Sequence, residues 1–461
     1  MMNEQELKNA FSSILTSLRV TPYGLGNQSG AVFALLAIKR LHDNDQVRPN
    51  NHSSVFNIEK SEWGFQEIKN QIAHGGIRSN SFIKQIIKKN SFLKDLPSTL
   101  GNLGFSDLDV VDQIENLNLS DENLEKEGTF AKVYSESLSD FFESGQGEFS
   151  TPLGLSSLLT QLTDFEPENR IYDPCAGLAG TLIKAKQLNE KTHDYQSKFE
   201  FFGQELNSEV AILANLNLAV NGVGPHIAVG DVLSNPAFLN QKKVEKFDRI
   251  VSQLPMGLKL SRGQQNRENA FGRFEQKFNS ETLNADRYLV QHILHSLTDE
   301  GKAVFSLTPS FLWIKGAEKK LRKFLIQSDF IEAILQLPHS ICNSTHVAPV
   351  VMILNKNKSM DRREKVFFID CQRQYSLDSQ GRKIFSDDNV ESIKRLFDAF
   401  QTQDFVSQII SAKKIDQNDY NLNPRLYIDD SAEANKVRKL IEQHANYERF
   451  SLSHPTISNE I

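Results

Sequence analysis

Three acidic residues stand at the carboxyl ends of three successive short β-rich runs, where they could bind a ligand. They are Asp173, Glu205 and Asp231. A carboxylate at the tip of a second strand can accept hydrogen bonds from both hydroxyls of a ribose, and one at the tip of a third strand can accept from an adenine amino group. Each acid alone could be a helix cap or a solvated loop residue. Three in order favour a nucleoside ligand.

The turn after the first acid is built from small residues. It reads Pro174-Cys175-Ala176-Gly177-Leu178-Ala179-Gly180 and runs into a segment with helical spacing. Such a turn brings backbone N–H groups close to a ligand, although a turn that binds nothing stays an alternative. The chain has no GxxxxGK[ST] phosphate loop, which disfavours an ATPase. A nucleoside with a cationic, non-phosphate tail fits the acids better, and S-adenosylmethionine is the candidate.

Other polar groups carry weaker signals. His292 and His295 are three residues apart with no evident third ligand, so we expect no metal site. The basic run from Lys315 to Lys323 favours a solvated helix face over a phosphate contact. The loop Lys259–Arg287 mixes basic and acidic residues, so its charge alone does not predict contact with DNA.

Alternating segments must position the three acids. Eight runs are typical of strands, namely Arg170–Asp173, Phe199–Glu205, His226–Asp231, Phe247–Gln253, Lys302–Leu307, Phe330–Leu337, Pro349–Asn355 and Val366–Asp370. Between them lie segments with helical spacing, among them Leu182–Asn189, Glu209–Asn221, Asp286–Leu297 and Gly316–Ile326. This alternation predicts the α/β class with a mainly parallel, doubly wound sheet, which binds its ligand at the carboxyl ends of its strands. By contrast, the helical spacing of apolar residues predicts an N-terminal helical domain at 1–140 and a C-terminal helical tail at 372–461.

Length and composition agree with this division. The 461 residues suffice for two or three domains, and a hydrophobic content of 39% rules out a disordered chain. The longest apolar run, Ala31–Ile38, is far shorter than the ~20 residues that span a bilayer, so we expect no membrane association. The net charge of −6 argues weakly against unaided binding of nucleic acid. Three scattered cysteines and a start without a signal sequence predict a cytoplasmic protein.

Five short motifs, in order, resemble the N6-adenine DNA methyltransferases, specifically the modification subunit of type I restriction–modification systems. They are Gly147–Pro152 (GEFSTP), Asp173–Gly180 (DPCAGLAG), Gly203–Asn207 (GQELN), Leu321–Lys323 with Leu335–Pro338 (LRK and LQLP), and Tyr420–Tyr427 (YNLNPRLY). The resemblance covers most of the chain. It implies a Rossmann-like, AdoMet-dependent DNA methyltransferase domain at 141–371 and a C-terminal tail that docks a partner.

The resemblance also implies a site and partners. The cofactor-binding residues would be Phe149, Thr151, Pro152, Asp173, Pro174, Cys175, Gly177, Gly180, Glu205 and Asp231. The cofactor would be S-adenosylmethionine and the substrate adenine in DNA. The partner would be a specificity subunit, which reads the DNA sequence, with a restriction subunit as a further candidate.

The family's catalytic element N-P-P-[FY] is altered in this chain. After Phe247–Ser252, which resembles the family's FDxVxAN strand, the chain reads Gln253-Leu254-Pro255-Met256. In the family the Asn amide oxygen accepts a hydrogen bond from the amino group of a flipped adenine, and the aromatic ring stacks on that base. Gln253 carries its amide one methylene further out, a displacement on the order of 1 Å that can cost ~100-fold in rate. Met256 packs on a base without a ring face.

Two functions therefore stay open. The first is an adenine-N6 methyltransferase subunit of a restriction–modification or related defence complex, with Gln253–Met256 as its catalytic segment. The second is a catalytically impaired subunit of the same fold that binds cofactor or DNA without transferring a methyl group. The sequence favours the first, because the acids on the cofactor side are all present.

Overall fold

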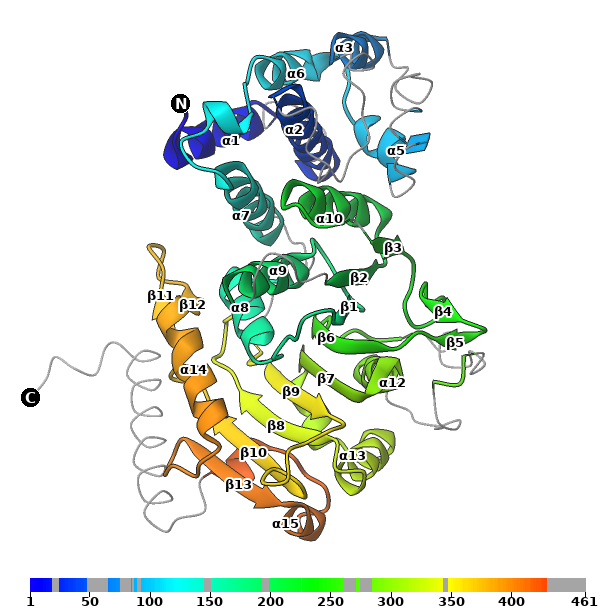
Figure 1. Ribbon diagram of the computed structural model, residues 1–461, viewed down its shortest axis with the longest axis vertical. Helices are drawn as coiled ribbons and strands as arrows, with labels where there is room; N and C mark the ends of the chain where they lie inside the picture. The colour runs from blue at the N-terminus through cyan, green and yellow to red at the C-terminus, as the bar shows by residue number, and fades with distance from the viewer. Residues whose placement is uncertain are drawn as a thin grey trace, which may run out of the picture.

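A nine-stranded sheet organises the chain in the computed structural model (Figure 1). The structure describes residues 1–18, 25–47, 65–74, 84, 87–88, 93–144, 151–192, 199–224, 226–260, 271–273, 284–342 and 347–428. In spatial order the strands are β13 (Ser407–Ser411), β10 (Lys365–Asp370), β8 (Ile331–Gln336), β9 (Val350–Asn355), β7 (Leu297–Leu307), β6 (Phe247–Gln253), β1 (Arg170–Asp173), β2 (Glu200–Glu205) and β3 (Ile227–Val229). Two short hairpins pair β4 (Leu239–Asn240) with β5 (Lys243–Val244) and β11 (Ser376–Leu377) with β12 (Lys383–Ile384).

Most neighbouring strands of the sheet run parallel. The pairs β3–β2, β2–β1, β1–β6, β6–β7 and β8–β10 are parallel, whereas β9 is antiparallel to both β7 and β8. The expected α/β class with a mainly parallel sheet is confirmed, and all eight expected strands are present. Their near-continuous apolar sequences follow from burial on both faces, as in Ile331–Leu335 of β8, where every residue is buried.

One strand of the sheet lies where the sequence predicts helices. β13 pairs antiparallel with β10 at the edge of the sheet. Its sequence, Ser-Gln-Ile-Ile-Ser, is too short for an alternating pattern to be visible, and pairing with β10 stabilises it. The expected helical tail at 372–461 is therefore only partly helical in its described part, 372–428: α14 (Asp387–Ala399) and α15 (Ala412–Gln417) are helices, whereas β11, β12 and β13 are strands. Residues 429–461 lie outside the described residues.

Helices cover both faces of the sheet, as a doubly wound fold requires (Figure 1). One face packs against α8 (Leu153–Gln161), α9 (Gly180–Thr192), α10 (Ser208–Val220) and α14. The other face packs against α12 (Asp286–Ser296) and α13 (Ala317–Gln327). The two apolar clusters draw alternate residues from the same strands, for example Ile171 and Tyr172 of β1, because successive strand side chains point to opposite faces.

The N-terminal part is helical, as expected. Its helices are α1 (Glu4–Leu18), α2 (Leu25–Val47), α3 (Phe65–Ala73), α5 (Leu96–Leu100), α6 (Leu108–Glu115) and α7 (Thr129–Ser144). The apolar run Ala31–Ile38 lies within α2 and is fully buried in the core of this part. Among the residues that the structure describes, no helix combines the length and apolar character needed to cross a membrane.

Helix α10 belongs to two cores at once. Ile212, Leu213 and Leu216 pack with the N-terminal helices, whereas Ala211 and Ala214 pack with the sheet. The helix is therefore apolar around its whole circumference, which is typical of a helix with no solvent face. In Figure 1 it lies between the N-terminal helices and the sheet.

Candidate functional site

The strand order brings the predicted acids and the segment 253–256 to one edge of the sheet. From β1 the chain proceeds outward to β2 and β3, whereas β6 lies on the other side of β1, so the winding reverses between β1 and β6. Such a reversal leaves a crevice at the carboxyl ends of the strands. A cavity of about 230 Å³ occupies this place. Its lining residues are Thr151, Pro174, Cys175, Gly177, Gln204, Glu205, Leu206, Gly230, Asp231, Val232, Leu233, Gln253, Leu254, Pro255, Met256, Leu258 and Leu289.

The structure brings together ten of the fourteen residues that the sequence singles out. Those that line the cavity are Thr151, Pro174, Cys175, Gly177, Glu205, Asp231, Gln253, Leu254, Pro255 and Met256. Pro152, Asp173 and Gly180 do not line it. Phe149 lies outside the described residues.

Asp173 is buried behind the turn that follows it, with an exposed fraction of 1%. Its Oδ1 accepts hydrogen bonds from Ser252 Oγ at 2.6 Å and from the Cys175 backbone N–H at 3.0 Å, and its Oδ2 accepts from Thr181 Oγ1. Burial raises the pKa of this carboxyl to about 6, and the three donors oppose the rise. Asp173 therefore fixes the turn to α9 and to β6 instead of facing the cavity.

The turn itself uses its N–H groups within the chain. Ala176 N donates to Gln204 O at 3.0 Å, and Gly177 N donates to Glu205 Oε2 at 3.1 Å. Gly177 has a φ of 51°, a backbone conformation that glycine adopts without strain. We expected backbone N–H groups of this turn to face a ligand. At these two positions they are instead hydrogen-bonded to β2, which ties the turn to this strand.

Glu205 lines the cavity and retains capacity for a ligand. Its Oε1 accepts from the Asn207 backbone N–H at 2.8 Å, while its Oε2 accepts from Gly177. The backbone N–H of Leu206 also interacts with this carboxylate. A carboxylate has about four lone-pair positions, so these bonds still leave room for a ligand. Burial raises its pKa, and the backbone N–H groups act in the opposite direction.

Asp231 is oriented by the loop that it begins. Its Oδ1 accepts from the Leu233 backbone N–H at 2.9 Å, and its Oδ2 accepts from Ser234 Oγ at 2.7 Å. This local turn holds the carboxylate at the cavity wall.

Gln204 is a site residue that sequence reasoning did not assign. It is fully buried, its Nε2 donates to Gly230 O at 3.1 Å and Asn235 O at 2.9 Å, and its Oε1 accepts from Ala237 N at 3.0 Å. One amide thus ties β2 to the loop that carries Asp231. Its position inside a quoted motif was the available signal, but three backbone partners distant in sequence cannot be inferred from a motif.

The segment that replaces the family's catalytic motif begins at the end of β6. Gln253 lines the cavity, its Nε2 lies 3.8 Å from Cys342 Sγ, and its Oε1 is buried without a hydrogen-bond partner among the described residues. Leu254 is fully buried, and its backbone N–H donates to Ser306 O of β7 at 3.2 Å. A proline at position 254 could not make this hydrogen bond.

Apolar side chains complete the cavity and were not predicted. Leu206, Val232, Leu233, Leu258 and Leu289 come from four separate segments. Leu206 is 70% exposed, which places a large apolar side chain at the rim. Apolar residues of this kind carry no distinct sequence signal, because core positions have the same composition.

Comparisons with known proteins give matches over most of the chain. The family model described as N-6 DNA Methylase matches residues 125–436. The MjaVII methylase subunit of a type I restriction enzyme from Methanocaldococcus jannaschii is 27% identical over 392 residues, which are 80% of this chain and 66% of that protein. The MjaVIII methylase subunit from the same organism is 29% identical over 61% of this chain and 50% of its own length. The chain thus spans less than two thirds of these two relatives.

Solved structures share the fold. A type I restriction–modification system methyltransferase subunit from Streptococcus thermophilus superposes with a TM-score of 0.73 at 19% identity, covering 92% of this chain and 99% of that one. A modification subunit of a putative type I restriction enzyme from Vibrio vulnificus gives a TM-score of 0.70 at 16% identity, covering 90% and 94%.

Proposed function

Because the chain belongs to the N-6 DNA methylase family, we propose that it transfers a methyl group from S-adenosylmethionine to N6 of adenine in DNA. It would do so as the modification subunit of a type I restriction–modification or related defence complex. The observation that carries this proposal is the single cavity at the reversal of the sheet, which Glu205, Asp231 and the segment Gln253–Met256 share. One cavity can thus hold cofactor and target base together.

The lining of the cavity fits S-adenosylmethionine. Two carboxylates, of Glu205 and Asp231, suit the ribose hydroxyls and the adenine amino group, and the apolar side chains suit the adenine face. Among the described residues that line it, none is a lysine or arginine, so this described lining offers no cation for a phosphate. When bound, the cofactor supplies an electrophilic methyl group on a sulfonium.

The chain's own residues would orient the adenine. The Gln253 amide oxygen would accept a hydrogen bond from the amino group, which keeps the nitrogen lone pair directed at the methyl group. This requires the side chain to rotate, because Oε1 is buried. Met256 and Pro255 would hold the faces of the flipped base.

Cofactor binding is tested by calorimetry with the full chain. Glu205→Gln removes the charged acceptor and should weaken S-adenosylmethionine binding about 10- to 100-fold, the effect of one hydrogen bond to a charged group. Glu200→Gln is the matched control, because Glu200 lies at the other end of the same strand and is exposed. The proposal fails if the wild-type protein, alone and with its partner subunits, does not bind the cofactor.

A second candidate function is a subunit that binds cofactor or DNA without methyl transfer. The buried Oε1 of Gln253 and the contact of its Nε2 with Cys342 favour it, since the amide in this position does not present its acceptor to a base. Transfer of labelled methyl from the cofactor to DNA, measured with all partner subunits present, separates the two. Cofactor binding without transfer would support the second candidate.

A further inference from the structure

Arg273 is a buried arginine directly beneath one wall of the cavity. Its exposed fraction is 1%. Nη1 donates to Val232 O at 2.7 Å, and Nη2 donates to Leu233 O at 2.6 Å. Val232 and Leu233 both line the cavity, so one guanidinium fixes two successive carbonyls of its wall.

The same two residues lead directly to Asp231. The backbone N–H of Leu233 donates to Asp231 Oδ1 at 2.9 Å, while its carbonyl accepts from Arg273. Leu233 is thus held on one side by the guanidinium and on the other by the carboxylate. A shift of Arg273 would move this peptide, and with it the orientation of the Asp231 carboxylate.

A buried histidine connects Arg273 to the first strand. His292 Nδ1 lies 2.7 Å from Arg273 Nη1, and His292 Nε2 lies 3.1 Å from the Tyr172 hydroxyl. A guanidinium only donates hydrogen bonds, so Nδ1 must be the acceptor and Nε2 must carry the proton that is donated to Tyr172. Burial lowers the pKa of His292 well below its usual range, which keeps this neutral tautomer.

The contacts therefore connect Arg273, through His292, to Tyr172 of β1. Tyr172, at the end of these contacts, immediately precedes Asp173. Burial lowers the pKa of Arg273 to about 10, so the side chain is still charged at neutral pH. Among the partners that hold this buried charge are two backbone carbonyls and an imidazole, and the guanidinium also lies over the Phe271 ring, 5.3 Å from its centroid.

We propose that Arg273 is a positioning residue that sets the affinity of the cavity for its nucleoside ligand by fixing Val232, Leu233 and, through Leu233, the Asp231 carboxylate. This rests on the proposed binding of S-adenosylmethionine. It also gives Arg273, which lies within the loop Lys259–Arg287, a role that the charge balance of the loop did not suggest, because this arginine is buried in the protein.

Arg322 provides a matched control. It is also 1% exposed, burial lowers its pKa to about 10, and it donates to backbone carbonyls of Tyr420, Phe311 and Ile314 at 2.6–2.9 Å. It lies on α13, and none of these residues lines the cavity. Replacing Arg322 removes an equivalent buried guanidinium without touching the site.

The test measures S-adenosylmethionine binding by calorimetry and thermal unfolding for Arg273→Met, Arg273→Lys and Arg322→Met in the full chain. Arg273→Met should weaken binding about tenfold or more, and Arg273→Lys, which keeps a charge but not the two-armed geometry, should fall between it and the wild type. Arg322→Met should lower the melting temperature at least as much and leave the affinity within about twofold.

Each outcome decides the question. An unchanged affinity in both Arg273 variants, with a normally binding wild type, would overturn the positioning role and leave Arg273 as a purely structural residue. If Arg273→Met does not fold, Arg273→Lys alone decides. A wild type that does not bind the cofactor contradicts the proposed function instead. In the unliganded protein, ¹⁵N spectra of the His292 ring should show the Nε2-protonated tautomer, and the opposite tautomer would contradict the contact chain.

Discussion

At the residue scale, Asp173 carries a buried carboxylate that does not line the cavity. Its folded-state pKa of about 6 lies above the ordinary value of 3.8, so between these values the folded state binds more protons than the unfolded state. Its ionised form therefore lowers the free energy of unfolding at neutral pH, and this effect fades as the pH falls through 6. Asp173→Asn cannot ionise at this position. Its free energy of unfolding, relative to that of the wild type, should therefore fall by about 1 kcal/mol when the pH is lowered from 7.5 to 5. Denaturant unfolding at both pH values measures this, and a difference that does not vary with pH would contradict it.

The segment Gln253–Met256 allows a second prediction at this scale. Gln253→Asn with Met256→Phe restores the shorter amide and a ring, and stacking on a ring is worth roughly 1–3 kcal/mol per base. If the protein transfers methyl groups, this double variant should methylate DNA faster than the wild type. A wild type that is inactive and stays inactive after the double change, with all partner subunits present, would favour the non-catalytic function.

Leu254 should not be replaced in that experiment. Its N–H donates to Ser306 O, and proline would remove the donor. The net loss would be about 0.5–1.5 kcal/mol of stability at the edge of the cavity. A triple variant with Leu254→Pro therefore serves as a comparison, with a lower melting temperature than the double variant.

Single residues also show how far sequence reasoning reaches. The strand-end position of Glu205 and Asp231 was predictable, because parallel strands end at one edge of a sheet. That Asp173 would turn inward was not, since this depends on hydroxyls of Thr181 and Ser252, which come from different elements. Arg273 and Gln204 were missed for the same reason: their partners, mostly backbone groups, are distant in sequence and only the folded chain brings them near.

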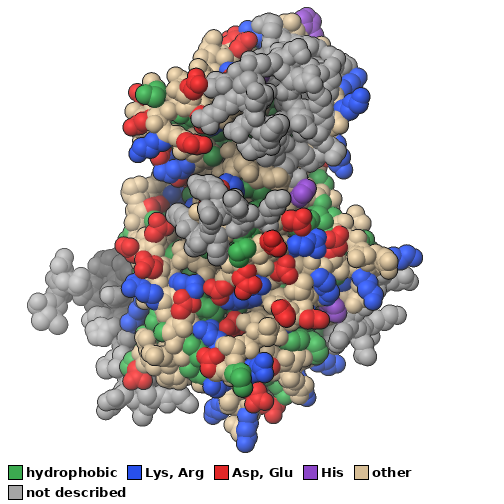
Figure 2. All heavy atoms as spheres, in the orientation of Figure 1, with side chains coloured by type: hydrophobic (Ala, Val, Ile, Leu, Met, Phe, Trp, Pro, Cys, Tyr) green, Lys and Arg blue, Asp and Glu red, His purple; other side chains and the backbone are tan. Residues whose placement is uncertain are grey.

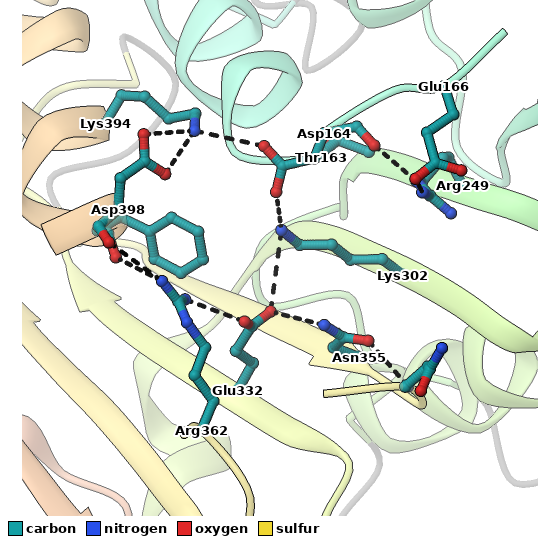
Figure 3. Close-up of polar contacts among 12 residues, drawn as sticks. Thr163, Asp164, Glu166, Arg249, Lys302, Glu332, Asn355, Arg362, Lys394 and Asp398 are labelled. Atoms are coloured by element: carbon teal, nitrogen blue, oxygen red, sulfur yellow. Dashed lines mark hydrogen bonds and ion pairs between the residues drawn. The ribbon is translucent and has the colours of Figure 1, made fainter. Parts of the chain in front are cut away.

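At the scale of elements, a charged network joins side chains of β7, β8 and α14 with those of neighbouring loops (Figure 3). Lys302 of β7 lies 2.5 Å from Asp164 and 3.8 Å from Glu332 of β8, and Arg362 lies 3.0 Å from Glu332. Lys394 of α14 lies 3.3 Å from Asp164. The Lys302 and Glu332 side chains are 7% and 4% exposed, so this network is partly desolvated. The network borders a polar cavity of about 410 Å³. Four of its charged residues, Asp164, Lys302, Glu332 and Arg362, line this cavity and are paired with one another.

Lys302→Met should lower the free energy of unfolding by about 2 kcal/mol, because it leaves Glu332 buried with one cation fewer. Lys394→Met is the control: its contacts with Asp164 and Asp398 are half-exposed, so the expected loss is within about 1 kcal/mol. Denaturant unfolding of both variants tests the ranking. S-adenosylmethionine affinity should be unchanged in both, and equal losses in the two variants would show that burial does not matter here.

The elements themselves were largely predictable, and the exceptions have a physical reason. Strands buried on both faces, such as β8 and β9, are marked by near-continuous apolar runs. The edge strand β13 is half-exposed and only five residues long, so its sequence carries little signal and its partner β10 determines its conformation. The direction of β9, antiparallel to both neighbours, is likewise a matter of chain connection and not of composition.

The whole molecule bears on partner binding. Acidic and basic side chains are interspersed over the face in Figure 2, and the net charge is −6, so we expect weak unaided binding to DNA. A specificity subunit would supply base recognition, and we propose that residues after Ile428 dock it. The cut must follow Ile428, because Tyr427 stacks on Phe368 at 4.5 Å between ring centroids and Ile428 is 6% exposed.

A chain ending at Ile428 should therefore keep its melting temperature and cofactor affinity and lose co-purification with the specificity subunit. A chain ending at Asn418 is the contrasting control, since it also removes Tyr427 from the core and should unfold at a lower temperature. Retention of the partner by the chain ending at Ile428 would place the docking surface elsewhere, with the N-terminal helices as the alternative.

Helix α10, finally, couples the unfolding of the N-terminal helical part to that of the part that contains the sheet. The residues of α10 complete both the N-terminal core and one core of the sheet. If either part unfolded, the other would lose apolar contacts that α10 makes in its core. Asn217 strengthens the coupling, since its Nδ2 donates to Leu178 O in the site's turn and its Oδ1 accepts from Ser135 Oγ of α7. The two parts should consequently unfold as one cooperative unit, with a single calorimetric peak whose van't Hoff and calorimetric enthalpies agree. Although the sequence predicts separate domains, heating should therefore unfold them together in one transition.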